Sequence, residues 1–319
     1  MFIRKYFPFL FVGSALQVFS PVGVCNEPPN SYRAEAELGY STTDGDDYDS
    51  KIVDLGFAYY LSPISISNTP YAEAPFLERA GAITVAYGKV DFESDFADGD
   101  GPAYGFDFRY AEKNMPFYIE VIYFKTDQDF DGKEIYKSAN IKADTRGVGL
   151  GYFLSDDSAI SLHYSQGDTT SEFYDPVPDL IFVAPERQTN KSNTDNYSLE
   201  FKKVILLEQN RAFNLDIGLL RSSYDDEYND SDRNHSAESG DNDEISLAVD
   251  YYSNAATSFG VGFSTNSGDE ESVEGDTLSL RAKYYVTPKF FFEGVFADFS
   301  AKQDDNDSQT ISFAVGARF

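Results

Sequence analysis

Apolar and polar residues alternate over the last eleven residues of the chain, from Gln309 to Phe319. Every second position is apolar, and the apolar set is Ile311, Phe313, Val315, Ala317 and Phe319. Because successive side chains of a strand point to opposite faces, this segment is predicted to be a strand with one apolar and one polar face. A single strand of this kind is also typical of a half-buried sheet in a soluble protein.

The same alternation recurs about every twenty residues from Tyr32 onward, and it predicts fourteen strands in all. The predicted strands lie near residues 32–41, 53–61, 83–87, 104–110, 117–123, 148–154, 159–165, 197–202, 213–219, 244–251, 259–263, 278–284, 292–296 and 310–319. Lys203 interrupts the alternation of the eighth segment, which predicts a β-bulge or an early strand end there. The repetition, more than any one strand, indicates an all-β chain.

The connections between these segments also alternate in kind. Long acidic connections are predicted at 42–50, 91–102, 126–140, 168–195, 223–243, 266–276 and 301–308, and most of the connections between them are short. Outer-membrane barrels have long external loops and short periplasmic turns, so an even strand number predicts that both termini are periplasmic. A further hairpin in residues 173–186 would raise the strand count to sixteen; alternatively, that segment folds inward as a constriction.

Composition narrows the fold class further. Mean hydropathy is −0.41, and no apolar run after position 30 approaches the roughly 18 residues that a membrane-spanning helix needs. Aromatic residues make up 16% of the chain, which is too many for a disordered acidic chain. The sequence therefore predicts a transmembrane antiparallel up-and-down β-barrel, closed because an open sheet edge in lipid leaves backbone groups unpaired. About eight strands fill their interior and sixteen leave a channel, so fourteen predict a water-filled pore that a loop can narrow.

The first 25 residues are predicted to be a signal peptide, and residues 26–319 the barrel. Arg4 and Lys5 precede an apolar stretch, and cleavage is predicted after Cys25, the only cysteine. The alternative is a lipoprotein in which Cys25 is the lipidated first residue.

The chain has 54 Asp and Glu against 25 Lys and Arg, a formal net charge of −29. Nucleic-acid binding is therefore not expected, because phosphates require Lys and Arg. The expected partners are outer-membrane lipid and lipopolysaccharide, together with small hydrophilic solutes and cations. The sequence leaves open whether the chain is a monomer or a homotrimer, and which solute it prefers.

Charged residues of the predicted strands alternate with the apolar residues, so the charged side chains are predicted to point into the barrel. An Arg or Lys on the lipid face at the bilayer midplane would cost about 2–4 kcal/mol. The predicted pore-lining residues are Arg33, Glu35, Glu37, Asp54, Asp107, Arg109, Glu120, Glu200, Lys202, Asp216, Asp250, Arg281, Lys283, Glu293 and Arg318. Acidic residues outnumber basic ones in this set, which predicts a mild preference for cations.

Two segments resemble sites that bind metal or catalyse hydrolysis. Asp127, Asp129 and Asp131, followed by Gly132, have the spacing of the first ligands of a calcium loop, and they predict at most weak Ca²⁺ binding. No other cofactor is expected. His163-Tyr164-Ser165-Gln166-Gly167 resembles the H-x-S-N-G stretch of outer-membrane phospholipases. The neighbouring apolar residues are predicted to face the lipid, so His163 and Ser165 are predicted to point into the lumen, away from a lipid substrate.

Residues Tyr59 to Gly81 read Y-Y-L-S-P-I-S-I-S-N-T-P-Y-A-E-A-P-F-L-E-R-A-G. This stretch resembles the segment after the second strand in a family of general porins from Gram-negative bacteria, in which A-E-A-x-F-L-x-R-A follows a strand ending in aromatics and Pro. The matching positions are Ala72, Glu73, Ala74, Phe76, Leu77, Arg79 and Ala80. The resemblance implies a passive outer-membrane channel and supplies no site residue. We interpret the stretch as a periplasmic helical turn whose Phe76 and Leu77 pack against the barrel end; an ordinary long turn is the alternative.

The sequence thus predicts an outer-membrane porin, a passive diffusion channel for ions and small hydrophilic solutes, and no enzyme. The main alternative is a non-conducting surface barrel whose acidic loops bind a partner or divalent cations. An outer-membrane lipid hydrolase is a third interpretation, and it requires His163 on the outside of the barrel.

Overall fold

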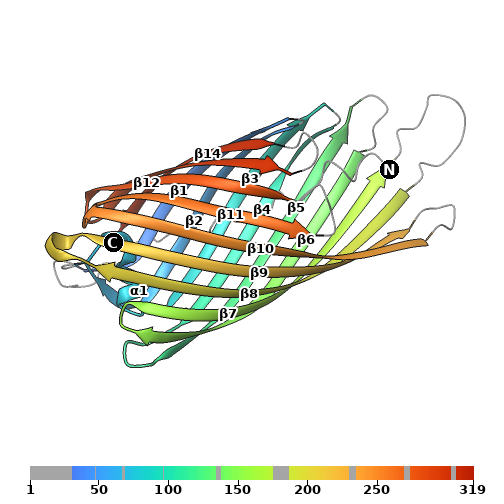
Figure 1. Ribbon diagram of the computed structural model, residues 1–319. Helices are drawn as coiled ribbons and strands as arrows, with labels where there is room; N and C mark the ends of the chain where they lie inside the picture. The colour runs from blue at the N-terminus through green and yellow to red at the C-terminus, as the bar shows by residue number, and fades with distance from the viewer. Residues whose placement is uncertain are drawn as a thin grey trace, which may run out of the picture.

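A computed structural model describes residues 31–46, 48–66, 69–95, 97–133, 138–174, 187–229, 235–268, 274–302 and 307–319. Fourteen antiparallel strands form one closed barrel in which each strand pairs with its neighbours in sequence (Figure 1). The barrel closes where β1 pairs with β14, through register partners such as Glu35 with Arg318 and Tyr40 with Phe313. The predicted signal peptide and the segment 175–186 lie outside the described residues.

The first seven strands are β1 (Ser31–Gly45), β2 (Tyr48–Ser65), β3 (Ala82–Ser94), β4 (Ala97–Tyr110), β5 (Phe117–Gly132), β6 (Ser138–Ser155) and β7 (Ser158–Tyr174). The others are β8 (Arg187–Leu206), β9 (Ala212–Asn229), β10 (His235–Asn254), β11 (Thr257–Gly268), β12 (Gly275–Thr287), β13 (Phe290–Ala301) and β14 (Ser308–Arg318). Short helical turns are η2 (Tyr71–Glu73), α1 (Ala74–Leu77) and η3 (Glu208–Asn210). None of the helices in the described ranges has the length and apolar character needed to cross a membrane.

The outer face of the barrel is apolar, as the alternation predicts. In β6, Val148, Leu150 and Leu154 are each more than half exposed, whereas Gly149 and Gly151 between them are buried. Comparable exposed Leu, Val, Phe and Tyr side chains recur on every strand. An apolar surface of this extent is typical of a barrel that contacts lipid tails.

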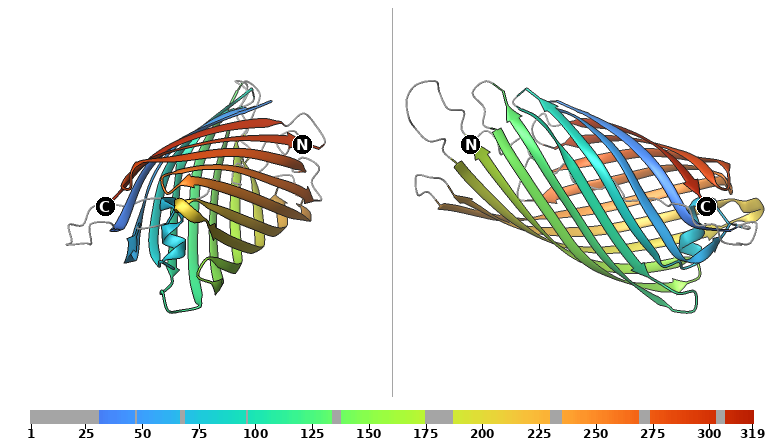
Figure 2. Two further views of the ribbon diagram at one scale, coloured as in Figure 1. Left: turned by 60° about the vertical axis from the view of Figure 1, so that its left-hand side comes forward. Right: turned by 180° about the vertical axis from the view of Figure 1, so that it is seen from behind.

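Several segments predicted to be loops are strand instead. Residues 126–132 belong to β5, and most of the predicted connections 168–195 and 223–243 belong to β7 to β10. These strands extend beyond the rest of the barrel at one end, which we call the long-hairpin end (Figure 2). Polar and acidic residues form these hairpins because strand pairing requires only backbone groups, and both faces of the extension can be hydrated.

The predicted break at Lys203 is not found, because β8 continues to Leu206 with unbroken pairing to β9. Lys203 Nζ lies 2.6 Å from Asp157 Oδ1, in the turn between β6 and β7. Hydrogen bonds from Lys203, first, and from Ser155 lower the pKa of the Asp157 carboxyl in that turn. The alternation ends at Lys203 because the strand has reached this turn, at what we call the short-turn end.

Candidate functional site

The chain between β2 and β3 folds into the short-turn end of the barrel, where α1 lies (Figures 1 and 2). We call residues 69–80 the plug. Pro75 occupies the first turn of α1, where a missing N–H breaks no intrahelical bond. Arg79 has φ of 51°, and Ala80 N donates to Pro75 O at 2.9 Å, so the helix ends in a left-handed residue.

The plug contacts strands from different sides of the barrel, so it crosses the lumen. Tyr71 packs edge-on against Tyr285 of β12, with 5.5 Å between ring centroids, and Tyr71 N donates to Ala255 O at 2.8 Å. Arg318 Nη1 of β14 donates to Tyr71 O at 2.9 Å. On another side, Arg79 Nη2 lies 2.9 Å from Asp156 Oδ1, in the turn between β6 and β7.

Phe76 and Leu77 pack against the inside of the barrel end, which confirms the interpretation of this stretch as a packed helical turn. Phe76 lies 6.0 Å from Phe153 of β6, centroid to centroid. Phe76 and Leu77 also pack against the cluster of Val204, Ala212 and Tyr252 on β8 to β10.

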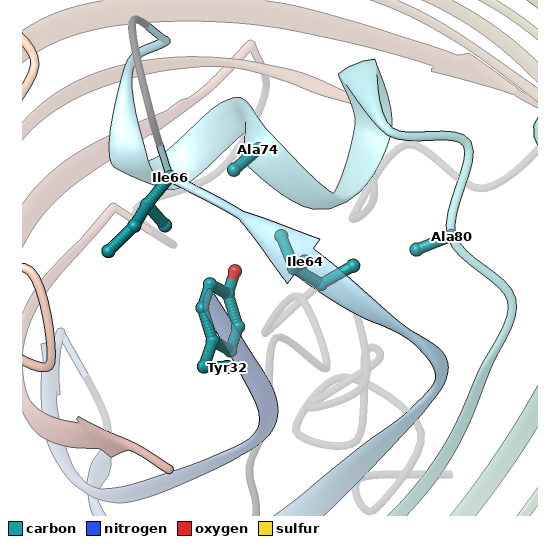
Figure 3. Packing of buried hydrophobic residues seen from close by; sticks show 5 residues of the cluster. All are labelled: Tyr32, Ile64, Ile66, Ala74 and Ala80. Atoms are coloured by element: carbon teal, nitrogen blue, oxygen red, sulfur yellow. The ribbon is translucent and has the colours of Figure 1, made fainter. Parts of the chain in front are cut away.

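A second part of the plug packs beside the first strand. Ala74 and Ala80 of the plug form a buried cluster with Tyr32, Ile64 and Ile66, which Figure 3 shows from close by. Tyr32 and Ile64 have no exposed surface. The plug therefore has its own apolar core, continuous with the barrel wall.

Glu73 is the charged centre of the plug and is only 5% exposed. Tyr252 Oη donates to Glu73 Oε1 at 2.6 Å, and Lys202 Nζ lies 2.9 Å from Glu73 Oε2. A buried carboxylate is costly unless it is paired and hydrogen-bonded, so these contacts fasten the plug to β8 and β10. The role of Glu73 was not predicted, although an acidic residue between two alanines in a stretch outside the strands is a signal in the sequence.

The predicted inward charges lie in three groups of contacts inside the barrel. In the first group, Arg109 pairs with Glu120, and His163 Nδ1 lies 3.5 Å from Glu120 Oε2. His163 Nε2 lies 3.9 Å from Glu200 Oε2. Asp107 precedes Arg109 by two positions on β4 and is the register partner of Ile122. Within the described residues, the Oδ1 atom of Asp107 is buried without a hydrogen-bond partner.

The second group lies beside the plug. Lys202 Nζ, which contacts Glu73, also lies 3.6 Å from Asp216 Oδ1. Arg281 pairs with Asp250 through two hydrogen bonds and lies 3.9 Å from Asp216 Oδ2. Two acids on neighbouring strands thus share two bases.

The third group surrounds the seam of the barrel. Arg318 Nε lies 2.5 Å from Glu35 Oε2, and Lys283 Nζ lies 2.6 Å from Glu293 Oε2. Lys283 also lies over the ring of Phe291, 4.2 Å from its centroid. Asp54 extends across Gly39 of β1, the strand that also carries Glu37.

Glycines on the luminal face allow charges on non-adjacent strands to meet. Gly149 of β6 is the register partner of both Glu120 on β5 and His163 on β7. In the same way, Gly260 of β11 separates Asp250 on β10 from Arg281 on β12, and a Cβ at Gly260 would overlap the Asp250 carboxylate. Each contact therefore requires the absence of a side chain on the middle strand.

Arg33 is the exception among the predicted luminal residues. A β-bulge lies between Tyr32 and Ala34, so Tyr32 turns inward and Arg33 Nη1 donates to Tyr59 Oη, at 3.4 Å, on the outer face. The prediction of a luminal Arg33 is wrong because the bulge shifts the alternation by one position.

The predicted calcium-loop residues lie on a regular strand. Asp127, Asp129 and Asp131 belong to β5, and the Asn140 side-chain amide donates to Asp127 Oδ1 at 3.2 Å and to Asp129 Oδ1 at 2.6 Å. The loop on which the prediction was based is not found there. Nowhere in the described ranges do three or more His, Cys, Asp or Glu side chains gather as a metal site would require.

His163 and Ser165 lie on the luminal side of β7, and Ser165 Oγ accepts from Asn196 Nδ2 at 3.4 Å. His163 contacts Glu120 and Glu200, as described above. Neither side chain faces the lipid, where a phospholipid substrate would lie.

The fold is that of an outer-membrane β-barrel with fourteen strands. Among solved structures, the Acinetobacter baumannii outer membrane protein Omp33 is similar, with a TM-score of 0.54 and 14% identity over 92% of this chain and 100% of that one. A deltaS2 mutant of the TodX monoaromatic hydrocarbon channel has a TM-score of 0.57 and 9% identity over 92% and 91% of the two chains. A Pseudomonas aeruginosa FadL homologue has a TM-score of 0.56 and 10% identity over 91% of each. No protein-family model and no curated protein sequence matches the chain.

Proposed function

We propose that this protein is a channel of the bacterial outer membrane through which ions and small hydrophilic solutes diffuse passively, with a mild preference for cations. The observation that carries the proposal is a closed barrel whose outer face is apolar and whose inside holds salt-bridged acidic and basic side chains. Charged walls of this kind favour water and polar solutes over apolar ones. The hydrocarbon channels named above share the fold, but the charged groups here favour a hydrophilic solute.

The proposed cation preference rests on how the luminal charges are paired. Arg109, Lys202, Arg281, Lys283 and Arg318 each contact an acidic partner. The acids of the predicted pore-lining set outnumber these bases, so the uncompensated charge is negative and attracts cations.

The proposed orientation places the short-turn end, with the plug and both ends of the barrel chain, in the periplasm. Tight turns are typical of the periplasmic side of such barrels, and long extensions of the outer side. The plug then narrows the periplasmic exit of the lumen.

Single-channel recording in a planar bilayer tests the proposal. Refolded protein in a salt gradient is expected to give discrete openings with a cation-selective reversal potential. Silence from protein that is folded, as judged by heat-modifiable migration, would contradict the channel proposal.

A second candidate is a non-conducting surface barrel, and the fastening of the plug by Glu73, Arg79 and Tyr71 favours it. In that case the hairpins of the long-hairpin end would bind the partner or divalent cations. Silence of the wild-type chain, together with silence of a variant whose plug is loosened, would favour this candidate.

A further inference from the structure

A cavity of about 160 Å³ lies in the luminal wall between β5 and β9. Its polar lining includes Ser165, Asn196 and Ser198, and its apolar lining consists of Ile122 and Leu220. Leu220 and Ile122 are the exceptions on strand faces that otherwise carry mostly small or polar residues in this region. The cavity thus has an aliphatic side and a hydrogen-bonding side.

Gly147 of β6 allows lining residues of β5 and β7 to lie close together. A Cβ at Gly147 would lie 2.7 Å from Ile122 Cγ1 and 2.8 Å from Ser165 Cβ, so side chains from β5 and β7 meet over an empty middle strand. Asn196 Oδ1 accepts from Ser222 Oγ at 2.6 Å, which fixes the orientation of that amide. Asn196 Nδ2 donates to Ser165 Oγ at 3.4 Å, so the Asn196 side chain is held in place before any ligand binds.

Acidic side chains outnumber basic ones beside the cavity. Glu200 lines the cavity with its side chain 58% exposed, and its Oε2 lies 3.9 Å from His163 Nε2. Asp107 and Glu120 lie on the adjacent strands, against the cations Arg109 and His163. Three carboxylates against at most two cations leave a net negative charge, which favours a cationic ligand.

The volume of the cavity suits a small ligand. Its volume is close to that of a protein cavity of about 150 Å³ that binds benzene, a molecule of six heavy atoms. Ile122 and Leu220 can contact an alkyl chain, while Glu200 accepts from an ammonium group and the serine hydroxyls and Asn196 provide further hydrogen bonds. His163 Nε2, buried without a hydrogen-bond partner among the described residues, lies at the same wall.

We propose that this cavity is a binding subsite for small primary alkylammonium ions, with Glu200 as the carboxylate that holds the ammonium group. The inference deepens the proposed function and rests on it, because it names a class of cation that the channel would retain along its wall. A solute held in this way would cross the lumen by binding to the wall and being released into the luminal water in turn.

The test is a ligand-observed NMR titration of the purified protein in non-ionic detergent micelles, with protein-free micelles as the blank. Pentylammonium, pentanol and pentanoate are the probes, since they differ in charge and share the alkyl chain. Pentylammonium is expected to bind about tenfold more tightly than pentanol, as a hydrogen bond to a charged group contributes. Glu200→Gln should abolish this difference, and the charge-matched Glu93→Gln, on the exposed face of β3, should retain it.

Equal affinities for pentylammonium and pentanol, or an unchanged preference in Glu200→Gln with native heat-modifiable migration, would overturn the proposal. Tighter binding of pentanoate would also overturn it and point to His163 as an anion-binding group. Because no ion flow is measured, a conducting barrel that binds no pentylammonium would contradict only the subsite. A silent barrel that binds it would contradict only the channel function.

Discussion

Ion pairs in two regions of this barrel differ in their exposure to water. At the short-turn end, Arg318 forms an ion pair with Glu35, and their side chains are 2% and 13% exposed. Glu73 is buried in the plug. At the long-hairpin end, Lys89 lies 2.9 Å from Asp91 and 3.1 Å from Asp100, and all three side chains are more than half exposed. Both regions contain ion pairs, but only the Arg318–Glu35 pair is removed from water.

The difference shows that the same pairing has different consequences in the two environments. A buried ion pair contributes little net free energy, but loss of one partner leaves an uncompensated charge that is very costly. An exposed pair is screened by solvent and contributes little in either case. Substitutions in the two regions should therefore differ clearly in their effect on the free energy of unfolding.

Replacing Arg318 by Met should have the largest effect on stability. The substitution leaves Glu35 buried without its guanidinium and removes the hydrogen bond to Tyr71 O, for an expected loss of about 3–5 kcal/mol in unfolding free energy. Urea unfolding in liposomes measures it. The double variant Arg318→Met, Glu35→Leu should recover most of the loss, and a single variant that loses less than about 1 kcal/mol would contradict the comparison.

Replacing Glu73 by Ala should release the plug. The substitution removes both the Lys202 and the Tyr252 contacts, but Lys202 keeps Asp216 at 3.6 Å, so a smaller loss of about 1–3 kcal/mol is expected. Because the plug crosses the lumen, single-channel conductance should increase. Glu78→Ala is the matched control in the same segment, since its partner Lys113 is 72% exposed, and it should leave the conductance unchanged. Equal conductance in both variants would argue against the plug as the constriction.

Two glycine substitutions compare a crowded with an open position on the wall. Gly260→Ala should destabilise the barrel by about 1–3 kcal/mol, because the new methyl group overlaps the Asp250 carboxylate and displaces it from Arg281. At Gly88 the nearest atom to a Cβ would be Val53 O at 3.6 Å, an ordinary contact, so Gly88→Ala should be neutral or stabilising by about 0.5–1 kcal/mol. Unfolding in liposomes measures both free energies. Equal losses of unfolding free energy in the two variants would contradict the proposed role of Gly260 in making room for the Asp250–Arg281 pair.

Replacing Lys89 by Ala should have the smallest effect. Its contacts with Asp91 and Asp100 lie in water at the long-hairpin end, where salt screens them. The urea midpoint in liposomes at physiological salt should equal that of the unsubstituted protein within experimental error. A clear decrease would show that the long-hairpin end is not solvated as described.

The local alternation determined much of the fold. The strands, their number and the apolar outer face follow from a period of two residues, which each segment shows without reference to the others. The inward direction of His163 was likewise predictable, because it depends on the residues next to it in sequence. The local pattern failed where polar residues continue a strand, as in residues 126–132, and at the bulge that turns Arg33 outward.

Only the tertiary structure decided which side chains meet. Glu73 and Tyr252 are 179 positions apart, and Glu120 reaches His163 only because Gly149 lies between them in register. Register depends on the pairing of whole strands, and a slip of one residue would reverse the face of every side chain. The face to which a side chain points is thus a property of each segment. The ion pairs, the plug contacts and the cavity beside Glu200 exist only once the barrel has closed.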